Sequence, residues 1–306
     1  MPEYFPRDFC GYGANPPQVI WPDNHQLALS VVVNYEEGSE SCPQDGDDVS
    51  ESWLTDIPGL KAHSHRHMSC ESVFNYGARA GAWRLIRTLQ EFKIPATVFA
   101  CGLALERNPD IARAFYNAGW ELAGHGWRWL DYSHFSEEEE CRHMRRTLEV
   151  IERLTGQKPS GWYTGRKSPY TRALALHHGL LWDSDAYDDD IPYTVSIEGH
   201  DHLVIPYTLV SNDCRYCMSP GWNTPEDAWL TLKATFDTLY REGATAPRMM
   251  TVALHSRLSG HPGRADAVRR FLEYAHQHSG VWFCRRNDIA KHWLKQTQHF
   301  KQQPAP

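Results

Sequence analysis

Short runs of apolar and β-branched residues alternate with amphipathic helical patterns, and this alternation constrains the fold more than any other sequence feature. We expect strands at 27–34, 96–102, 120–125, 161–165, 181–186, 202–207, 249–255 and 281–285. Strands that alternate with helices are typical of an α/β fold with a parallel sheet, either doubly wound or closed into a barrel. No linker or internal repeat interrupts the pattern. We therefore expect one domain over 1–306, with 1–26 as an N-terminal extension and 301–306 as a disordered tail.

Three of the expected helices have clear start signals. A capping box at 136–139 opens the first, Thr224 with Pro225 opens the second, and the third starts after Gly263. The longest stretch without a periodic pattern runs from Glu36 to about Ser72. Loops of this length within a domain are usually functional or disordered.

Charge and cysteine content exclude several classes of protein. A formal charge of -7 provides no basic surface for a phosphate backbone, and no apolar run of about 18 residues could span a membrane. The N-terminus lacks the basic and apolar segments of an export signal. The 8 cysteines are irregularly spaced, and we interpret the CxxC pair Cys214 and Cys217 as loop or core thiols. We therefore expect a cytoplasmic protein with no nucleic-acid or membrane partner.

Ionisable side chains follow the predicted strands at the point where each strand ends. They are Glu36, Glu37, His125, Arg166, Asp183, Asp185, His255 and Arg257. The carboxyl ends of parallel strands meet at one edge, where α/β enzymes carry their reactive groups. Hydrolysis of an amide needs a base for water, a donor for the oxyanion and an acid for the leaving nitrogen. One such residue could equally cap a helix or form a structural ion pair, but five such strand ends together predict an active site.

The order of these motifs resembles the polysaccharide deacetylase superfamily, also called carbohydrate esterase family 4 or NodB-like, and especially its branch of metal-independent allantoinases. The motifs are NYEEG at 34–38, MSCES at 68–72, YGARAG at 76–81, HGWRW at 125–129, GWYTGR at 161–166, DSDAY at 183–187 and HPGR at 261–264. The resemblance implies a distorted (β/α) barrel of about seven parallel strands. It also implies a homotetramer that opens the hydantoin ring of allantoin, a small cyclic ureide, to allantoate in purine catabolism.

The same resemblance bears on metal binding. In metal-dependent members the first motif carries two aspartates and the second carries two metal-binding histidines, four residues apart. Here Glu36 and Glu37 occupy the first motif, and Trp129 stands where a second histidine should follow His125. An indole has no basic lone pair, so we expect no metal cofactor. If zinc were bound, Glu37 and His125 would be ligands; a replacement ligand from the histidines at 63–67 is less favoured than an exposed loop.

The resemblance also implies catalytic roles. Glu36 becomes the base that activates water, held by Arg166, and Glu37 competes for that role. If both carboxylates reach the pocket, their repulsion raises the pKa of one of them. His255 becomes the acid that protonates the leaving nitrogen, and Asp185 orients its imidazole.

The remaining implied roles concern the substrate. His125 becomes a donor to the oxyanion, and Asp183 is the substitute for Asp185 beside His255. The side chains expected around the substrate are Tyr35, Glu71, Arg79, Trp127, Trp129, Tyr163 and Asp183. For the aromatic residues among them, a place in the core or at an interface is an equal alternative, because large rings dominate both.

Two other functions share this fold. One is a zinc-dependent N-deacetylase that acts on chitin or peptidoglycan, which needs a metal and usually export. The other is a catalytically inactive homologue with a binding or structural role, which the polar strand ends disfavour. Other cyclic ureides, such as hydantoins or dihydropyrimidine-like rings, also remain open as substrates.

Overall fold

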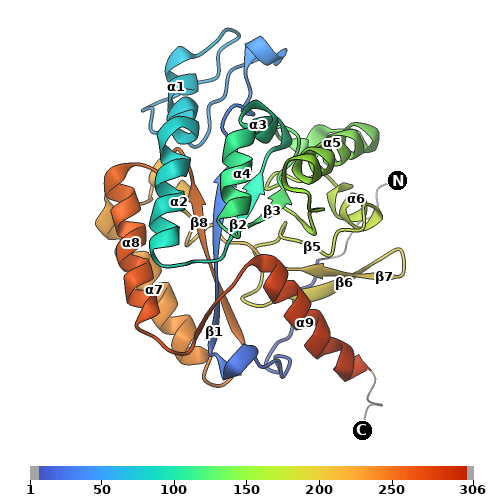
Figure 1. Ribbon diagram of the computed structural model, residues 1–306. Coiled ribbons are helices and arrows are strands. Elements are labelled where there is room, and N and C mark those ends of the chain that lie inside the picture. The colour runs from blue at the N-terminus through green and yellow to red at the C-terminus, as the bar shows by residue number, and fades with distance from the viewer. Residues whose placement is uncertain (1–6, 302–306) are drawn as a thin grey trace.

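The expected strands form one curled sheet at the centre of the molecule (Figure 1). The structure is a computed structural model and describes residues 7–301, with side chains described for 7–297. The strands are β1 (Leu27–Tyr35), β2 (Ala96–Ala100), β3 (Glu121–Gly124), β4 (Gly161–Trp162), β5 (Trp182–Asp183), β6 (Tyr193–Ile197), β7 (His200–Val204), β8 (Arg248–His255) and β9 (Val281–Phe283). All eight predicted strands are present, and β6 was not predicted.

Seven of these strands run parallel, in the order β8, β1, β2, β3, β4, β5 and β7, within the described part of the chain. Strand β6 adds to β7 in the antiparallel direction, and β9 pairs with β1 outside this path. Between the β7 and β8 edges, an isolated parallel bridge joins Asn212 to Ala253. The sheet is therefore a half-barrel, which confirms the predicted distorted (β/α) barrel of about seven parallel strands.

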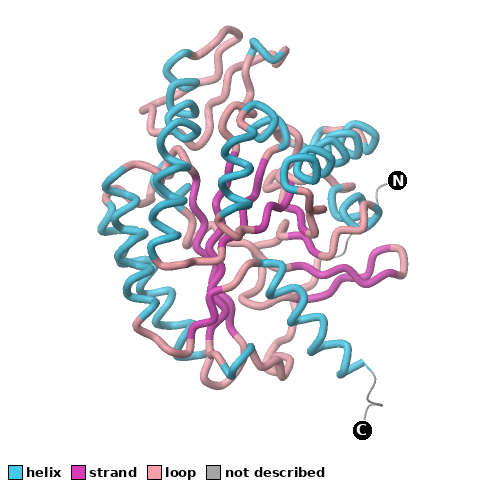
Figure 2. Tube along the Cα trace, viewed as in Figure 1, coloured by secondary structure: helices cyan, strands magenta, loops and turns pink. Residues whose placement is uncertain are grey.

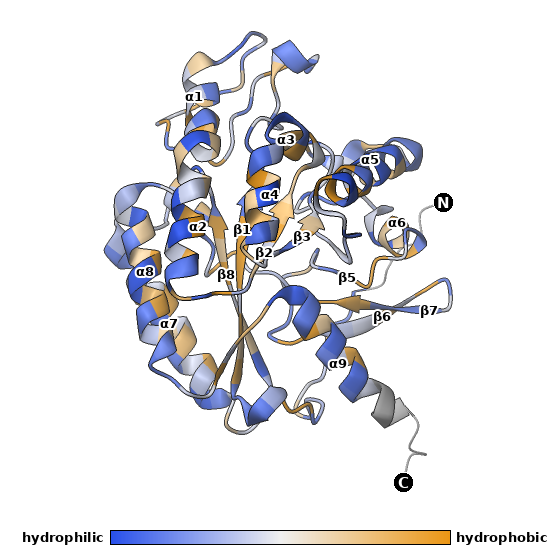
Figure 3. Ribbon diagram, viewed as in Figure 1, coloured by the Kyte–Doolittle hydropathy of each residue, from blue (hydrophilic) through white to orange (hydrophobic). Residues whose placement is uncertain are grey.

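Helices cover the outer face of the sheet (Figures 1 and 2). They are α1 (Met68–Tyr76), α2 (Ala82–Glu91), α3 (Gly102–Arg107), α4 (Pro109–Asn117), α5 (Glu137–Thr155), α6 (Thr171–His177), α7 (Pro225–Glu242) and α8 (Pro262–His276). The last helix, α9 (Arg286–Lys301), packs on the other face of the sheet, where Ile289, Ala290 and Trp293 join the core around Ala28 and Val32. The predicted capping box opens α5 at Ser136, and Thr224 caps α7 in the same way. Figure 3 shows the apolar strands inside and the hydrophilic faces of the helices outside. Apolar burial therefore fixes these helices on the sheet.

The long predicted loop is shorter than expected, because α1 begins at Met68. The imidazole of His67 accepts the N–H of Cys70 and so caps this helix. A five-residue π-helical segment, Gly77–Gly81, then joins α1 to α2. The two glycines of this segment weaken the helical signal in the sequence.

Gly81 and Gly260 allow an unusually close contact between the π-helical segment and the turn after β8. A Cβ atom on Gly81 would lie 2.0 Å from the carbonyl oxygen of Ser256, and one on Gly260 would lie 2.4 Å from the Cα of Gly81. No side chain fits there unless the backbone moves. The contact thus supports the turn that follows His255.

We expect Gly81→Ala to lower the free energy of unfolding by about 1–3 kcal/mol, as overpacking commonly does. Urea denaturation followed by circular dichroism measures this change. Gly263→Ala is the matched control, because a Cβ there meets only Pro225 at 3.7 Å and alanine favours the helix. Equal stabilities of the two variants would contradict this account.

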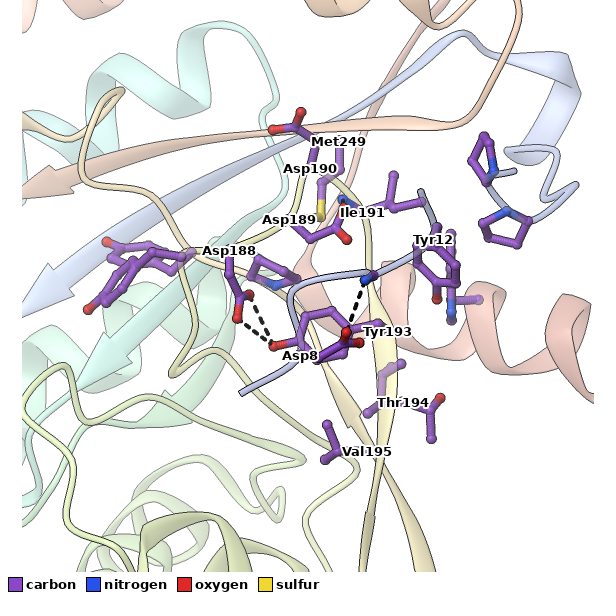
Figure 4. Close-up of a pocket in the computed structure, with 18 of the residues that line it drawn as sticks. Asp8, Tyr12, Asp188, Asp189, Asp190, Ile191, Tyr193, Thr194, Val195 and Met249 are labelled. Carbon is purple, nitrogen blue, oxygen red and sulfur yellow. Dashed lines mark hydrogen bonds between the residues drawn. The ribbon is translucent and has the colours of Figure 1, made fainter. Parts of the chain in front are cut away.

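The N-terminal segment runs beside β6 and the acidic residues 188–190 (Figure 4). The hydroxyl of Tyr12 donates to the carbonyl of Pro192, and Trp21 packs on Trp293 of α9. A groove of about 2820 Å³ lies between this segment, β6 and β7. The predicted extension is therefore packed against the sheet. Of the predicted disordered tail, Lys301 ends α9 and 302–306 lie outside the described residues.

Two further features bear on the environment of the protein. All 8 cysteines are free thiols, and Cys214 and Cys217 lie in a short 3-10 helix. Among the described residues, no helix combines the length and the apolar character that crossing a membrane requires.

Candidate active site

Three of the predicted catalytic side chains meet at the carboxyl edge of the sheet. Glu36 follows β1, His125 follows β3, and His255 ends β8, where it is in register with Asn34. Oε1 of Glu36 lies 3.0 Å from Nε2 of His125 and 3.6 Å from Nε2 of His255. These three residues expose 1%, 3% and 4% of their surface, so their charges interact without much solvent screening.

The hydrogen bonds of His125 define where its protons lie. Nδ1 is 2.7 Å from the carbonyl oxygen of Tyr163, which can only accept, so Nδ1 carries a hydrogen. Nε2 faces a carboxylate oxygen of Glu36, which is also an acceptor unless it is protonated. One proton must therefore lie between His125 and Glu36, and the pair can pass that proton to a third group.

Glu36 is held in its ionised form. Burial favours the neutral acid, but the charges of Arg257, His255 and His125 outweigh it and lower the pKa of Glu36 below its ordinary value. Nη1 of Arg257 lies 2.7 Å from Oε2 of Glu36. This contact corrects the prediction for Arg166, which donates instead to the carbonyl of Trp129.

Glu37 lies beside the same guanidinium, with its Oε1 3.7 Å from Nη1 of Arg257. Its Oε2 accepts the N–H of Glu36, and its Oε1 accepts the N–H of Arg257 at 3.1 Å. A Cβ on Gly77 would come within 2.4 Å of Oε1, so this carboxylate is enclosed by backbone. Burial and the charge of Glu36 raise the pKa of Glu37 to about 7, although Arg257 opposes this shift. The predicted repulsion thus acts on Glu37, and Glu37 supports the site by holding Arg257.

Asp213 orients His255. Its Oδ1 lies 2.6 Å from Nδ1 of His255, and its Oδ2 accepts the backbone N–H of the same residue at 2.7 Å. Burial lowers the pKa of His255, but the charges of Asp213 and Glu36 outweigh it, and the net pKa is raised. This geometry leaves Nε2 of His255 directed at Glu36 with a proton available to donate.

The prediction that Asp185 orients His255, with Asp183 as its substitute, is wrong. Asp185 accepts the backbone N–H groups of Thr164 and Gly165, while Asp183 pairs with Arg172 and with His202. Burial and the charge of Asp183 raise the pKa of Asp185. Both aspartates therefore fix the chain after β4 and β5, close to the site but not in contact with its acid.

Two of the predicted substrate-binding rings lie beside the catalytic cluster. Tyr163 stacks on His125 with 5.0 Å between ring centroids. Trp129 packs against Arg257, whose guanidinium carbon is 4.9 Å from the centroid of the ring, and against Phe74. These rings form an apolar wall next to the charged groups, as a planar substrate requires.

The other predicted substrate-binding residues lie elsewhere. Tyr35 belongs to the face of β1 that packs under the helices, and its hydroxyl accepts from Asn108. Trp127 is covered by Arg146 of α5. Glu71 forms an ion pair with Arg66 in the loop, and Arg79 is exposed on the π-helical segment.

A three-ligand metal centre does not fit these residues. Among residues 7–297, no three His, Cys, Asp or Glu side chains are arranged to hold a metal ion. The indole of Trp129, at the position of the second histidine, packs on arginine side chains and has no lone pair to offer. The histidines at 63–67 form an exposed ring stack, in which Nδ1 of His67 is already engaged as a helix cap.

Sequence reasoning missed the roles of Asp213 and Arg257. Asp213 follows Asn212, whose bridge to β8 places the aspartate beside His255. No strand or motif in the sequence marks that bridge. Arg257 did give a signal, because it follows His255 by two residues. The family resemblance instead assigned the role of holding Glu36 to Arg166.

Comparisons with known proteins show the family of this chain. The polysaccharide deacetylase family model matches residues 61–180. A Schizosaccharomyces pombe protein that carries the family's name is 38% identical, over 95% of this chain and 97% of its own. A Helicobacter pylori peptidoglycan deacetylase is 25% identical, over 74% of this chain and 88% of its own. A crystal structure of PuuE allantoinase is 46% identical, with a TM-score of 0.93, over 96% of this chain and 98% of that one. The chain belongs to the polysaccharide deacetylase family.

Proposed function

We propose that this protein is a metal-independent cyclic amidohydrolase that opens the hydantoin ring of allantoin to allantoate. The observation that carries the proposal is the buried cluster of Glu36, His125 and His255, with Trp129 where a metal-binding histidine would stand. The 46% identity to PuuE allantoinase over 96% of the chain supports the substrate. The predicted homotetramer and cytoplasmic location stay predictions.

The chemistry can be assigned to this chain's own residues. Glu36, ionised and paired with His125, takes a proton from water while the water oxygen bonds to the ring carbonyl carbon. The carbonyl electron pair moves to oxygen and forms a tetrahedral oxyanion. His255 then gives its Nε2 proton to the ring nitrogen as the carbon–nitrogen bond breaks and the carbonyl re-forms. Asp213 stabilises the imidazolium that must exist before this transfer.

A second candidate is favoured by the names of the relatives. The Schizosaccharomyces pombe and Helicobacter pylori proteins are named as polysaccharide or peptidoglycan deacetylases. An N-acetyl group offers the same amide carbon and leaving nitrogen to Glu36 and His255. It differs from the first proposal in needing a bound metal and an open groove for a polymer.

A substrate panel with and without a chelator separates the two candidates. We expect the enzyme to open allantoin, to release no acetate from acetylated chito-oligomers, and to keep its full rate after dialysis against EDTA. Ring opening is measured as allantoate formed, and acetate is measured enzymatically. Hydantoin, which has the same five-membered ring without the ureido substituent of allantoin, serves as the control for recognition of that substituent. Acetate release that is lost on dialysis and restored by zinc would instead establish the deacetylase.

A further inference from the structure

Arg257 is a fully buried cation whose donors are not all used. It exposes 0% of its surface, and its Nε donates to the carbonyl of Leu54 at 2.9 Å. Nη1 forms the 2.7 Å ion pair with Glu36 and lies 3.7 Å from Oε1 of Glu37. Among the described residues, neither Nη1 nor Nη2 has a partner in hydrogen-bond geometry, so Nη1 keeps only its ion pair and Nη2 has no polar partner at all. A buried charged donor without an acceptor is costly, so it needs an explanation.

The surroundings of this guanidinium suit a neutral, planar ligand. Its central carbon lies 4.3 Å from the ring centroid of Phe74 and 4.9 Å from that of Trp129. These rings keep water from the guanidinium and strengthen any hydrogen bond that it makes. Because the guanidinium is planar and rigid, the contact of Nη1 with Glu36 fixes Nη2 next to the base.

We propose that Nη2 of Arg257 donates to the oxygen of the carbonyl that is attacked, and so binds the substrate and stabilises the oxyanion. This inference rests on the proposed hydrolysis of a cyclic amide and adds a substrate contact to it. One guanidinium then holds the base with Nη1 and the reacting carbonyl with Nη2. After ring opening the same donor faces a carboxylate oxygen of the product.

Arg257 could act by contacting the substrate or by positioning Glu36, and ligand binding to a variant that lacks the base distinguishes these two roles. In the Glu36→Gln variant, positioning of a base no longer matters. Isothermal titration gives the Kd of allantoin and of allantoate for this variant and for the same variant carrying Arg257→Lys. We expect lysine to weaken both ligands by about 10- to 100-fold, because a charge-assisted hydrogen bond is lost.

Arg264→Lys in the Glu36→Gln background is the matched control. Arg264 is also stacked on an aromatic ring, that of Tyr216, and is ion-paired with Asp56, but it does not contact Glu36. We expect its Kd values to equal those of Glu36→Gln. Unchanged Kd values with Arg257→Lys, or no binding of either ligand to Glu36→Gln, would overturn the proposal.

A test without a change at Arg257 covers the case in which Arg257→Lys does not fold. An allantoin analogue with sulfur in place of the attacked carbonyl oxygen should bind Glu36→Gln about 10-fold more weakly or worse, because sulfur is a poor acceptor. Equal binding would overturn the proposal. If allantoate binding depends on Arg257 but the wild-type enzyme does not open allantoin, the proposed function fails and the carboxyl contact stands. If allantoin is opened but its Kd is the same with and without Arg257→Lys, only the proposal on Arg257 fails.

Discussion

Glu36→Gln is expected to lower kcat by about 100- to 10,000-fold and to leave ligand binding nearly unchanged. Glutamine keeps the shape of the side chain but cannot take a proton from water. Glu36 is the residue on which His125, His255 and Arg257 converge, so no other described carboxylate is placed to replace it. Single-turnover kinetics with allantoin and calorimetric titration of the same ligand measure the two quantities.

Glu37→Gln is the matched control for this variant. The pKa of Glu37 is raised to about 7, so its neutral form is already populated near neutral pH, and glutamine resembles that form. Its oxygens accept backbone N–H groups, and an amide oxygen retains one of these contacts. We expect a much smaller loss of kcat. If the two variants lose activity equally, the assignment of Glu36 as the base is wrong.

His255→Ala is expected to cost about 100- to 10,000-fold in kcat, the usual effect of removing a general acid. His255 donates its proton only while it is protonated. Its pKa is raised by Asp213 and Glu36 against the effect of burial, so activity should be full below this raised pKa and fall as the pH rises through it. The fall of kcat on the alkaline side of its pH profile, the alkaline limb, measures this titration of His255.

Asp213→Asn should move that limb toward lower pH, because the carboxylate charge that raises the pKa of His255 is gone. Asp185→Asn removes a carboxylate that contacts only backbone N–H groups near β4, so it should leave the limb in place even if the rate falls. A shift in the Asp185 variant and none in the Asp213 variant would restore the original assignment.

Most of the fold could be predicted from the sequence, because buried segments can be recognised from their local pattern of apolar residues. Every residue of β1 is buried, and such strands appear as apolar runs between helices. The first four residues of strand β6 alternate between partly exposed and exposed positions and only Ile197 is buried, so this strand carried no apolar run. The helix α1 was hidden for a different reason, because its apolar residues do not gather on one face and it ends at the glycines of the π-helical segment.

The site was predicted in part, and the division has a physical basis. Glu36, His125 and His255 each end a strand, so the parallel sheet alone brings them to one edge. Their partners are not fixed by strand order. Asp213 reaches His255 through a loop bridge, and Arg257 reaches Glu36 through the turn after β8. Such contacts depend on side-chain geometry across 42 or more residues, which no local pattern encodes.

The pairing of β1 with β8 has a consequence for how the chain folds. Leu27 of β1 pairs with Arg248, so the central strand of the sheet lacks one neighbour until more than two thirds of the polypeptide has been synthesised. Contacts of such sequence separation slow folding, because the intervening chain must be ordered before they form. Glu36, the proposed base, follows β1, which is synthesised early. His255, the proposed acid, ends β8, which is synthesised late. Enzyme activity should consequently be among the last properties to emerge during biosynthesis or refolding.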